Sequence, residues 1–118
     1  MTVRSVIKGV GSALPRQRVD NAELAARVDT SDEWIVERTG IRTRYVAQPD
    51  ETTATLAADA ARKALAQAGM DASEIGLIVL ATATPDQTFP SSATKVQALL
   101  GINDCIAFDV HAVCTGFL

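Results

Sequence analysis

The sequence predicts an α/β fold with a mainly parallel sheet. Helix-like and strand-like segments alternate along the chain, and residues 76–84 form an almost unbroken apolar run, as in strands that are covered on both faces. The chain has 118 residues, of which 47% are apolar, and this is enough for one hydrophobic core. We therefore expect a single domain over residues 1–118, with no linker.

The first part of the chain predicts two strands and two short helices. Residues 3–10 contain several β-branched residues and indicate a strand that ends near Gly9 and Gly11. Asp20, with Glu23 three residues later, predicts a capped helix in which Glu23 returns the capping bond. Residues 30–33 repeat this signal and begin a second helix, which ends at Gly40. Residues 41–47 indicate a short strand.

The longest predicted helix starts at Thr52 or Thr53 and continues to about Ala68, with Gly69 as its stop. Small and aliphatic residues form one stripe along it, which allows a close approach to a sheet or to another helix. The stripe consists of Leu56, Ala57, Ala60, Ala61, Ala64, Leu65 and Ala68. Asp71 and Glu74 form a further capping pair immediately after this helix.

The last part of the chain predicts two strands separated by a helix. The apolar run 76–84 is the first strand, a helix extends from Pro90 to Leu100 with Gly101 as its stop, and residues 105–112 form the next strand. Alternation of this kind implies parallel strands joined by right-handed crossovers.

Composition excludes several classes of protein. The net charge is −3 and the basic residues are scattered, so no patch indicates binding to nucleic acid. The start of the chain lacks the apolar core of a signal peptide, and no segment approaches membrane-spanning length. We therefore expect a cytoplasmic protein with no membrane partner, in which Cys105 and Cys114 are free thiols.

The segment 109–118, DVHAVCTGFL, is the strongest functional signal. A strand that ends on Cys114 and turns at once into a helix would place the thiol over the helix N-terminal amides. There the helix dipole favours the thiolate, which attacks carbonyl carbon, and the same amides could stabilise an oxyanion. The alternative is a buried cysteine that acts as a small apolar residue. We favour the nucleophile.

Other residues in or near this segment are weaker candidates for a catalytic role. Cys105 lies at the start of the strand, where no helix follows, and inert packing is favoured. His111 is an odd number of residues from Cys114, so on a strand the two would point to opposite faces, and a pocket-lining role is favoured over that of a base. Asp109 is interpreted as a polar group at the sheet end and Asp86 as a turn residue. No metal site is expected.

Several motifs together closely resemble β-ketoacyl-acyl-carrier-protein synthase III. Residues 29–42, DTSDEWIVERTGIR, are similar to the N-terminal signature of that family. Residues 76–82, GLIVLAT, residues 89–91, FPS, and residues 107–110, AFDV, match it in order and spacing, as do Ala112, Cys114, Gly116 and Phe117. The similarity covers nearly the whole chain. His111, Val113 and Thr115 differ from the small residues that the family usually has at these positions.

The resemblance implies a thiolase fold, which has two similar αβαβα halves and usually forms a homodimer. This chain resembles the first half, whereas the catalytic His and Asn of the family lie in the second. The cysteine would take an acetyl or other short acyl group from coenzyme A and condense it with malonyl-acyl-carrier-protein in fatty acid synthesis. No cofactor is expected, since the coenzyme A thioester is a substrate.

The resemblance also suggests roles for four other residues. Trp34 and Arg38 share a helix face, and spacing alone favours a core tryptophan beside a solvated arginine. The family instead uses these positions to stack on the adenine of coenzyme A and hold its nucleotide. Thr30 either caps the helix or contacts the nucleotide. Phe89 either packs on the sheet or, as in the family, crosses the dimer interface to line the partner's acyl pocket.

Two other interpretations remain open. One is a related thiolase-fold starter synthase of secondary metabolism, and the other is a non-catalytic module that binds acyl groups or nucleotides. The module is disfavoured because the apolar faces of residues 77–83 and 105–112 need covering from elsewhere. We therefore expect that an isolated 1–118 polypeptide neither folds stably nor turns over substrate.

Overall fold

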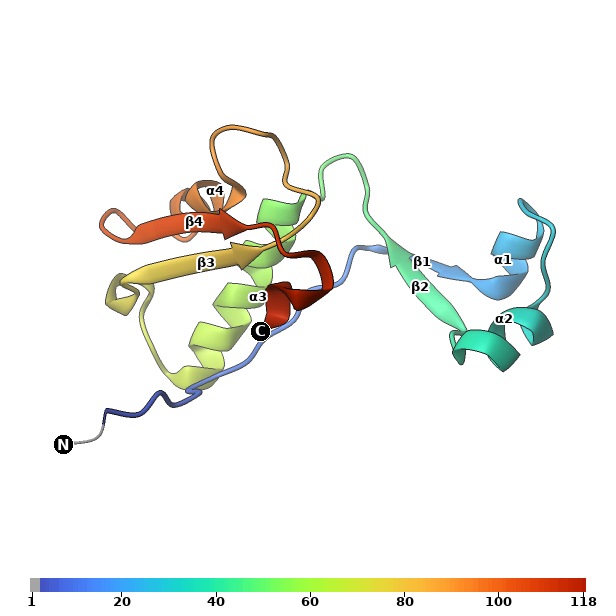
Figure 1. The fold of residues 1–118 in the computed structure, drawn as a ribbon, viewed down its shortest axis with the longest axis horizontal. Helices are drawn as coiled ribbons and strands as arrows, with labels where there is room; N and C mark the ends of the chain where they lie inside the picture. The colour runs from blue at the N-terminus through green and yellow to red at the C-terminus, as the bar shows by residue number, and fades with distance from the viewer. Residues whose placement is uncertain (1–2) are drawn as a thin grey trace. The chain divides into compact units, whose positions relative to one another are not determined.

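The computed structural model describes residues 3–118, which form an α/β chain with two compact units (Figure 1). The smaller unit, residues 14–51, contains β1 (Gln17–Asp20), α1 (Asn21–Ala25), α2 (Asp32–Thr39) and β2 (Thr43–Val46). The larger unit, residues 3–13 and 52–118, contains α3 (Thr53–Ala68), η1 (Ala72–Glu74), β3 (Leu77–Ala81), α4 (Ser92–Leu99), β4 (Ile106–Val110) and η2 (Val113–Phe117). The expectation of one domain over 1–118 stays a prediction.

In the smaller unit, β1 and β2 form an antiparallel pair in which Asp20 lies opposite Thr43. The strand predicted over 41–47 is confirmed as β2, whereas the sequence did not indicate β1. The side chain of Asp20 caps α1 by accepting from the Glu23 N–H at 2.9 Å. The expected return bond from the Glu23 carboxylate is not formed, because this group pairs with Arg27 at 2.8 Å.

Helix α3 confirms the predicted long helix. Its N-cap, Thr52, and Thr55 form reciprocal capping bonds, and Gly69 ends the helix in a left-handed conformation with φ of 64°. Ala54 and Ala58 of α3 are buried against Val96 of α4, with Ala57, Ile78 and Leu100 at the edge of this core. Because the contact is made by alanines, the two helices pack closely.

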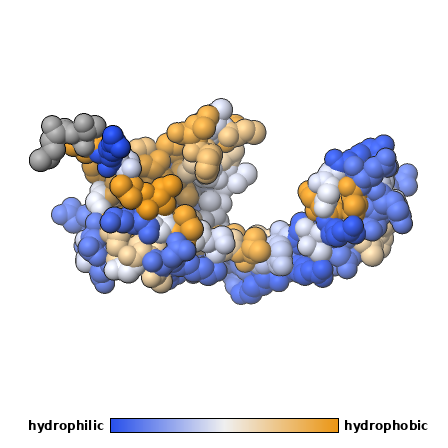
Figure 2. Space-filling model, turned by 90° about the horizontal axis from the view of Figure 1, so that it is seen from below, coloured by the Kyte–Doolittle hydropathy of each residue, from blue (hydrophilic) through white to orange (hydrophobic). Residues whose placement is uncertain are grey.

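Strands β3 and β4 confirm the predicted parallel pairing, with Leu77 opposite Ile106 and Ala81 opposite Val110. Both strands are shorter than the runs 76–84 and 105–112. Helix α4 packs against both strands on one face only. The other face exposes Leu77, Val79, Ile106 and Phe108 within the described residues, so this face needs covering from elsewhere, as the sequence predicted. Figure 2 shows apolar side chains gathered on the surface of the larger unit. The instability of an isolated 1–118 polypeptide stays a prediction.

Residues 3–10 do not form the predicted strand. The segment runs along α3, and the Val10 N–H donates to the Gln67 side chain at 2.6 Å instead of to a neighbouring strand. Gly9 and Gly11 lie so close to α3 that an added Cβ would collide with the carbonyl oxygens of Ala64 and Ala60. The expected close approach to the small-residue stripe of α3 is thus found, although its partner is this irregular segment.

Helix α4 begins at Ser92 rather than at Pro90, because the N-cap is Ser91, whose hydroxyl accepts from the Thr94 N–H at 3.4 Å. Gly101 follows the helix in a left-handed conformation with φ of 71°, as expected for a stop. Over residues 3–118, the helices are too short or too polar for any of them to cross a membrane.

Candidate functional site

Cys114 lies in η2, the short 3₁₀ helix that follows β4, and its side chain is exposed. Strand β4 ends at Val110, so the expectation that the strand reaches Cys114 is wrong. The turn is tight because the N–H groups of Thr115 and Leu118 each donate to the carbonyl three residues earlier, at 3.0 Å. This exposure does not fit the alternative of a buried cysteine, and the role of Cys114 as a nucleophile stays a prediction.

The backbone before and after Cys114 is fixed by two unusual features. Val113 has φ of 48°, a left-handed conformation that is rare and strained for a β-branched residue. Gly116 packs on the end of β3, where an added Cβ would lie 3.1 Å from the Ala81 Cβ. The Thr115 hydroxyl also donates to the Ala112 carbonyl at 2.6 Å. Cys114 is therefore held on a constrained and accessible turn.

The other two candidates of this segment, Cys105 and His111, lie beyond opposite ends of β4. His111 is exposed and lies beyond β4, as does Cys114. Strand alternation therefore cannot assign them to opposite faces, and that argument against His111 as a base does not apply. Cys105 is half-buried next to the start of β4, and its carbonyl accepts from the Gln97 side chain at 3.5 Å. Its inert role stays a prediction.

A polar network that the sequence did not indicate ties β4 to the start of α4. The Asp109 carboxylate accepts from the backbone N–H groups of Ser92 at 2.7 Å and Ala93 at 2.8 Å. The buried hydroxyl of Ser92 in turn accepts from the Asp86 N–H at 3.0 Å. Asp109 is thus a helix cap supplied from a neighbouring strand. The feature of the sequence that could have indicated this role is a carboxylate within an otherwise apolar strand.

Asp86 continues this network to the start of α3. Its side chain is 7% exposed and accepts from the Ala54 N–H at 3.2 Å. Burial acts to raise the pKa of Asp86, but the Thr52 hydroxyl, the Ala54 N–H and the Lys95 ammonium outweigh burial and lower the pKa. Asp86 is therefore an ionised cap of α3, which is more than the expected turn residue.

Trp34 and Arg38 lie together on α2 in the smaller unit. The Arg38 guanidinium carbon is 4.4 Å from the centroid of the Trp34 ring, a cation–π contact. Trp34 is 52% exposed, so the alternative of a core tryptophan is wrong. The buried residue of α2 is Ile35. The helix therefore presents a flat aromatic surface and a positive charge to solvent.

Thr30 is next to this aromatic surface. The N-cap of α2 is Ser31, whose hydroxyl accepts from the Trp34 N–H at 3.1 Å, so the interpretation of Thr30 as the cap is wrong. Thr30 instead lines an open hollow of about 580 Å³ together with Asp29, Ser31 and Trp34. The hollow combines an indole with hydroxyl groups, which suits a flat polar ligand.

Phe89 lies in the loop between β3 and α4 and is 86% exposed, so it does not pack on the sheet as one alternative expected. The loop is held by side chains on either side of it. Gln87 donates to the Phe89 carbonyl at 2.8 Å, and Lys95 donates to the Gln87 side chain at 2.9 Å. The aromatic ring is thus presented to solvent from an anchored loop.

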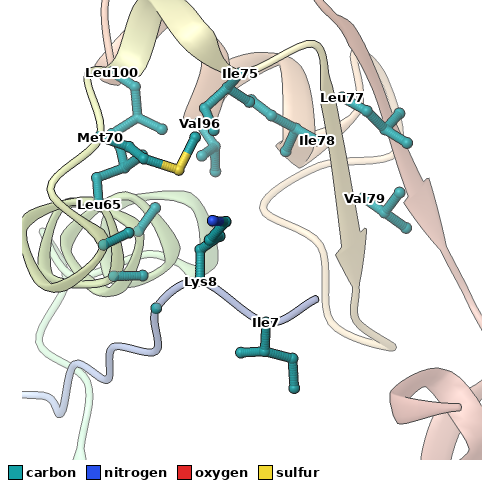
Figure 3. Close-up of a pocket in the computed structure, with 14 residues that line it drawn as sticks. Ile7, Lys8, Leu65, Met70, Ile75, Leu77, Ile78, Val79, Val96 and Leu100 are labelled. Carbon is teal, nitrogen blue, oxygen red and sulfur yellow. The ribbon is translucent and has the colours of Figure 1, made fainter. Parts of the chain in front are cut away.

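A separate apolar cavity of about 390 Å³ lies in the larger unit between residues 7–9, α3 and β3 (Figure 3). The Lys8 side chain points into this cavity and Ile7 points away from it. None of the candidate site residues lines the cavity. Within residues 3–118, no three His, Cys, Asp or Glu side chains gather as a metal site would need.

The chain is similar to known proteins over its whole length. The chain is 75% identical over 118 residues to β-ketoacyl-[acyl-carrier-protein] synthase III of Sphingopyxis alaskensis, covering all of this chain and 37% of the relative. The corresponding enzyme of Rhizorhabdus wittichii is 73% identical over 98% of this chain and 36% of its own length. The chain thus spans little more than a third of the curated relatives it matches. No family model matches it.

The chain is also similar to solved structures of condensing enzymes. The fold superposes on 3-oxoacyl-[acyl-carrier-protein] synthase III of Aquifex aeolicus with a TM-score of 0.90 and 47% identity, over 94% of this chain and 36% of that one. It also superposes on the priming β-ketosynthase of the R1128 polyketide pathway, with a TM-score of 0.86 and 40% identity, over 90% of this chain and 32% of that one.

These likenesses define the class: the fold is part of the thiolase fold of condensing enzymes. Within that class, the chain is homologous to the N-terminal part of β-ketoacyl-[acyl-carrier-protein] synthase III, as the sequence motifs indicated.

Proposed function

We propose that this chain supplies the nucleophilic cysteine of a β-ketoacyl-acyl-carrier-protein synthase III, which transfers a short acyl group from coenzyme A and starts fatty acid synthesis. The observation that carries the proposal is the exposure of Cys114 on a turn constrained by the left-handed Val113. The high identity to enzymes of that name supports it. A constrained and accessible thiol is what covalent acyl transfer needs.

The chemistry proceeds in two steps. The Cys114 thiolate attacks the thioester carbonyl carbon, the new C–S bond forms, and coenzyme A leaves as its thiolate and takes up a proton. Malonyl-acyl-carrier-protein then loses carbon dioxide, and the resulting carbanion attacks the acyl carbon and releases the Cys114 thiolate. Backbone N–H groups near the turn are suited to stabilise the oxyanion of the first step. The second half of the fold, with its His and Asn, completes the active site.

Trp34, Arg38 and Thr30 form the nucleotide end of the coenzyme A site in this proposal. The half-exposed indole offers a stacking face for adenine, and the guanidinium beside it offers charge for a phosphate. Thr30 lines the hollow next to the indole, and its hydroxyl is not used as the helix cap. This end of the site binds the carrier, whereas Cys114 performs the chemistry.

Phe89 is proposed to line the acyl pocket of the second subunit in a cytoplasmic homodimer. Its exposure on an anchored loop supports this role, because the ring is available for contact with a second subunit. Acyl carrier protein is the second macromolecular partner that the proposal requires.

A related starter synthase of secondary metabolism is the second candidate. The likeness to the R1128 priming β-ketosynthase favours it, with 40% identity over 90% of this chain. The two candidates share the thiol chemistry and differ in the starter acyl group. A comparison of acetyl-coenzyme A with branched and longer acyl-coenzyme A substrates separates them by kcat/KM.

Covalent labelling tests the proposal. The full-length protein, as expressed from its own gene, is incubated with radiolabelled acetyl-coenzyme A, denatured and digested. We expect label on the peptide that contains Cys114, and no label after Cys114→Ala. Cys105→Ala is the matched control, because this second cysteine is half-buried, and it should label normally. Binding of acetyl-coenzyme A without a thioester would instead indicate a non-catalytic module and would overturn the proposal.

A further inference from the structure

One buried amide joins the two ends of helix α2. Asn21 is 2% exposed, and its side-chain nitrogen donates to the Asp32 carboxylate at 2.7 Å and to the Ile41 carbonyl at 2.8 Å. Asp32 is the first residue of α2, and Ile41 lies just beyond Gly40, its left-handed C-cap. Both hydrogens of one amide are therefore used to fix where α2 begins and where the chain leaves it.

Helix α2 depends on such anchors because it has only eight residues. Isolated helices of this length are marginal in water, so tertiary contacts determine their position. The described contacts of α2 include one buried apolar residue, Ile35, and the bond from Asn21 to Asp32, while the second Asn21 bond holds Ile41 just after the helix. Asn21 itself is the first residue of α1 and directly follows β1. Its bonds therefore fix the position of α2 relative to the β1–β2 pair.

We propose that Asn21 is a positioning residue for the coenzyme A nucleotide, acting through α2 on the surface formed by Trp34 and Arg38. This inference rests on the proposed function of that surface. Asn21 is buried and does not reach solvent on its own. Loss of its two bonds frees α2 to shift against the β1–β2 pair, and the indole and guanidinium shift with it.

This position uses a side chain that donates two hydrogen bonds, as the Asn21 amide does. A carboxylate at the same place would accept and not donate, and it would face the Asp32 carboxylate at hydrogen-bond distance, where two like charges repel. Alanine would leave the Ile41 carbonyl without this donor. Exchange of the two residues, Asn21→Asp with Asp32→Asn, restores one bond because the amide at position 32 can donate to the carboxylate at position 21.

The test compares two substrates in the full-length protein. Acetyl-coenzyme A carries the nucleotide, and acetyl-pantetheine has the same thioester without it. We expect Asn21→Ala to raise KM for acetyl-coenzyme A by about tenfold, the loss expected from a displaced stacking and charge contact. The kinetic constants for acetyl-pantetheine should remain unchanged. Asn21→Asp should show the same selective defect, and the exchange variant should recover part of the wild-type KM.

Val19→Ala is the matched control. Val19 is buried to the same extent on β1, and its truncation lowers stability without removing a bond to α2. We expect an unchanged ratio of the two KM values for this variant. If Asn21→Ala does not fold, Asp32→Ala removes one of the two bonds and should give a smaller rise in the same ratio.

The outcomes separate this inference from the proposed function. A wild-type protein that does not prefer acetyl-coenzyme A to acetyl-pantetheine contradicts the nucleotide site itself. A wild-type preference that survives Asn21→Ala, Asn21→Asp and Asp32→Ala overturns the inference alone. Equal losses of kcat/KM with both substrates also overturn it, since they indicate a general effect on folding.

Discussion

The Arg38 guanidinium lies over the Trp34 ring at 4.4 Å from its centroid, one helical turn further along α2. The cation restricts the indole, and half of the Trp34 surface remains exposed. A flat ligand that stacks on the indole would therefore meet a ring that is already oriented, and its negative groups would meet the guanidinium. Under the proposed function, we therefore expect both side chains to contribute to binding the nucleotide of coenzyme A.

We expect Arg38→Ala to raise KM for acetyl-coenzyme A by about tenfold in the full-length protein, with little change in kcat. Arg38→Lys should recover only part of the loss, because an ammonium is not planar and stacks less well. Steady-state kinetics with acetyl-coenzyme A and acetyl-pantetheine measure this. Arg27→Ala is the control, since Arg27 is an exposed arginine of the same unit that pairs with Glu23. An equal effect of Arg38→Ala on both substrates would contradict the prediction.

Val113 should control acylation through its backbone. Proline cannot adopt the left-handed φ of 48° found here, so Val113→Pro must move the turn and the Cys114 sulfur with it. We expect about a 100-fold slower acylation, the loss typical of a displacement near 1 Å. Asparagine tolerates this conformation, and Val113→Asn should acylate at nearly the normal rate. Rapid-quench acylation with labelled acetyl-coenzyme A measures both rates, and similar rates for the two variants would refute the role of the turn.

Gly9 should be needed for the contact between residues 3–13 and α3. An added Cβ would collide with the Ala64 carbonyl oxygen and lie 3.0 Å from the Ala68 Cβ, and helix backbone cannot move aside cheaply. We expect Gly9→Ala to lower the free energy of unfolding by about 1–3 kcal/mol. Gly76→Ala is the control, because nothing lies within 4 Å of the added Cβ. Urea denaturation of the full-length protein measures the difference, and equal stabilities would show that the contact is absent in solution.

Local signals in the sequence predicted the helices well. Capping residues and glycine stops give the bounds of α3 almost to the residue, because Thr52 and Gly69 act on the helix through their immediate neighbours. The parallel pairing of β3 and β4 also followed from the order of elements. Similarly, the spacing of Trp34 and Arg38 placed them on one face of α2.

Structural features that depend on residues far apart in the sequence were not predicted. Residues 3–10 have the composition of a strand, but a strand also needs a neighbour, and here Val10 bonds to a helix side chain. Asn21 and Asp109 are polar residues whose acceptors and donors lie 11 or more positions away in the chain, so no local pattern indicates their bonds. The exposure of Cys114 likewise depends on how η2 packs on β3.

Asp86 should make stability depend on pH in the acid range. Its pKa is lowered in the folded protein, so its stabilising contribution is complete above about pH 4, the ordinary range of an aspartate, and is lost as the pH falls through the lower folded value. We expect Asp86→Ala to cost about 1–3 kcal/mol at pH 7, since it removes charged hydrogen bonds at the start of α3, and to cost progressively less as the pH falls below about 4. Denaturation of the full-length protein at several pH values measures this. Asp59→Ala, which removes an exposed carboxylate paired with Arg62, should cost little throughout. If the free-energy cost of Asp86→Ala stays constant down to the lowest pH at which the protein folds, the charge of Asp86 does not stabilise the helix.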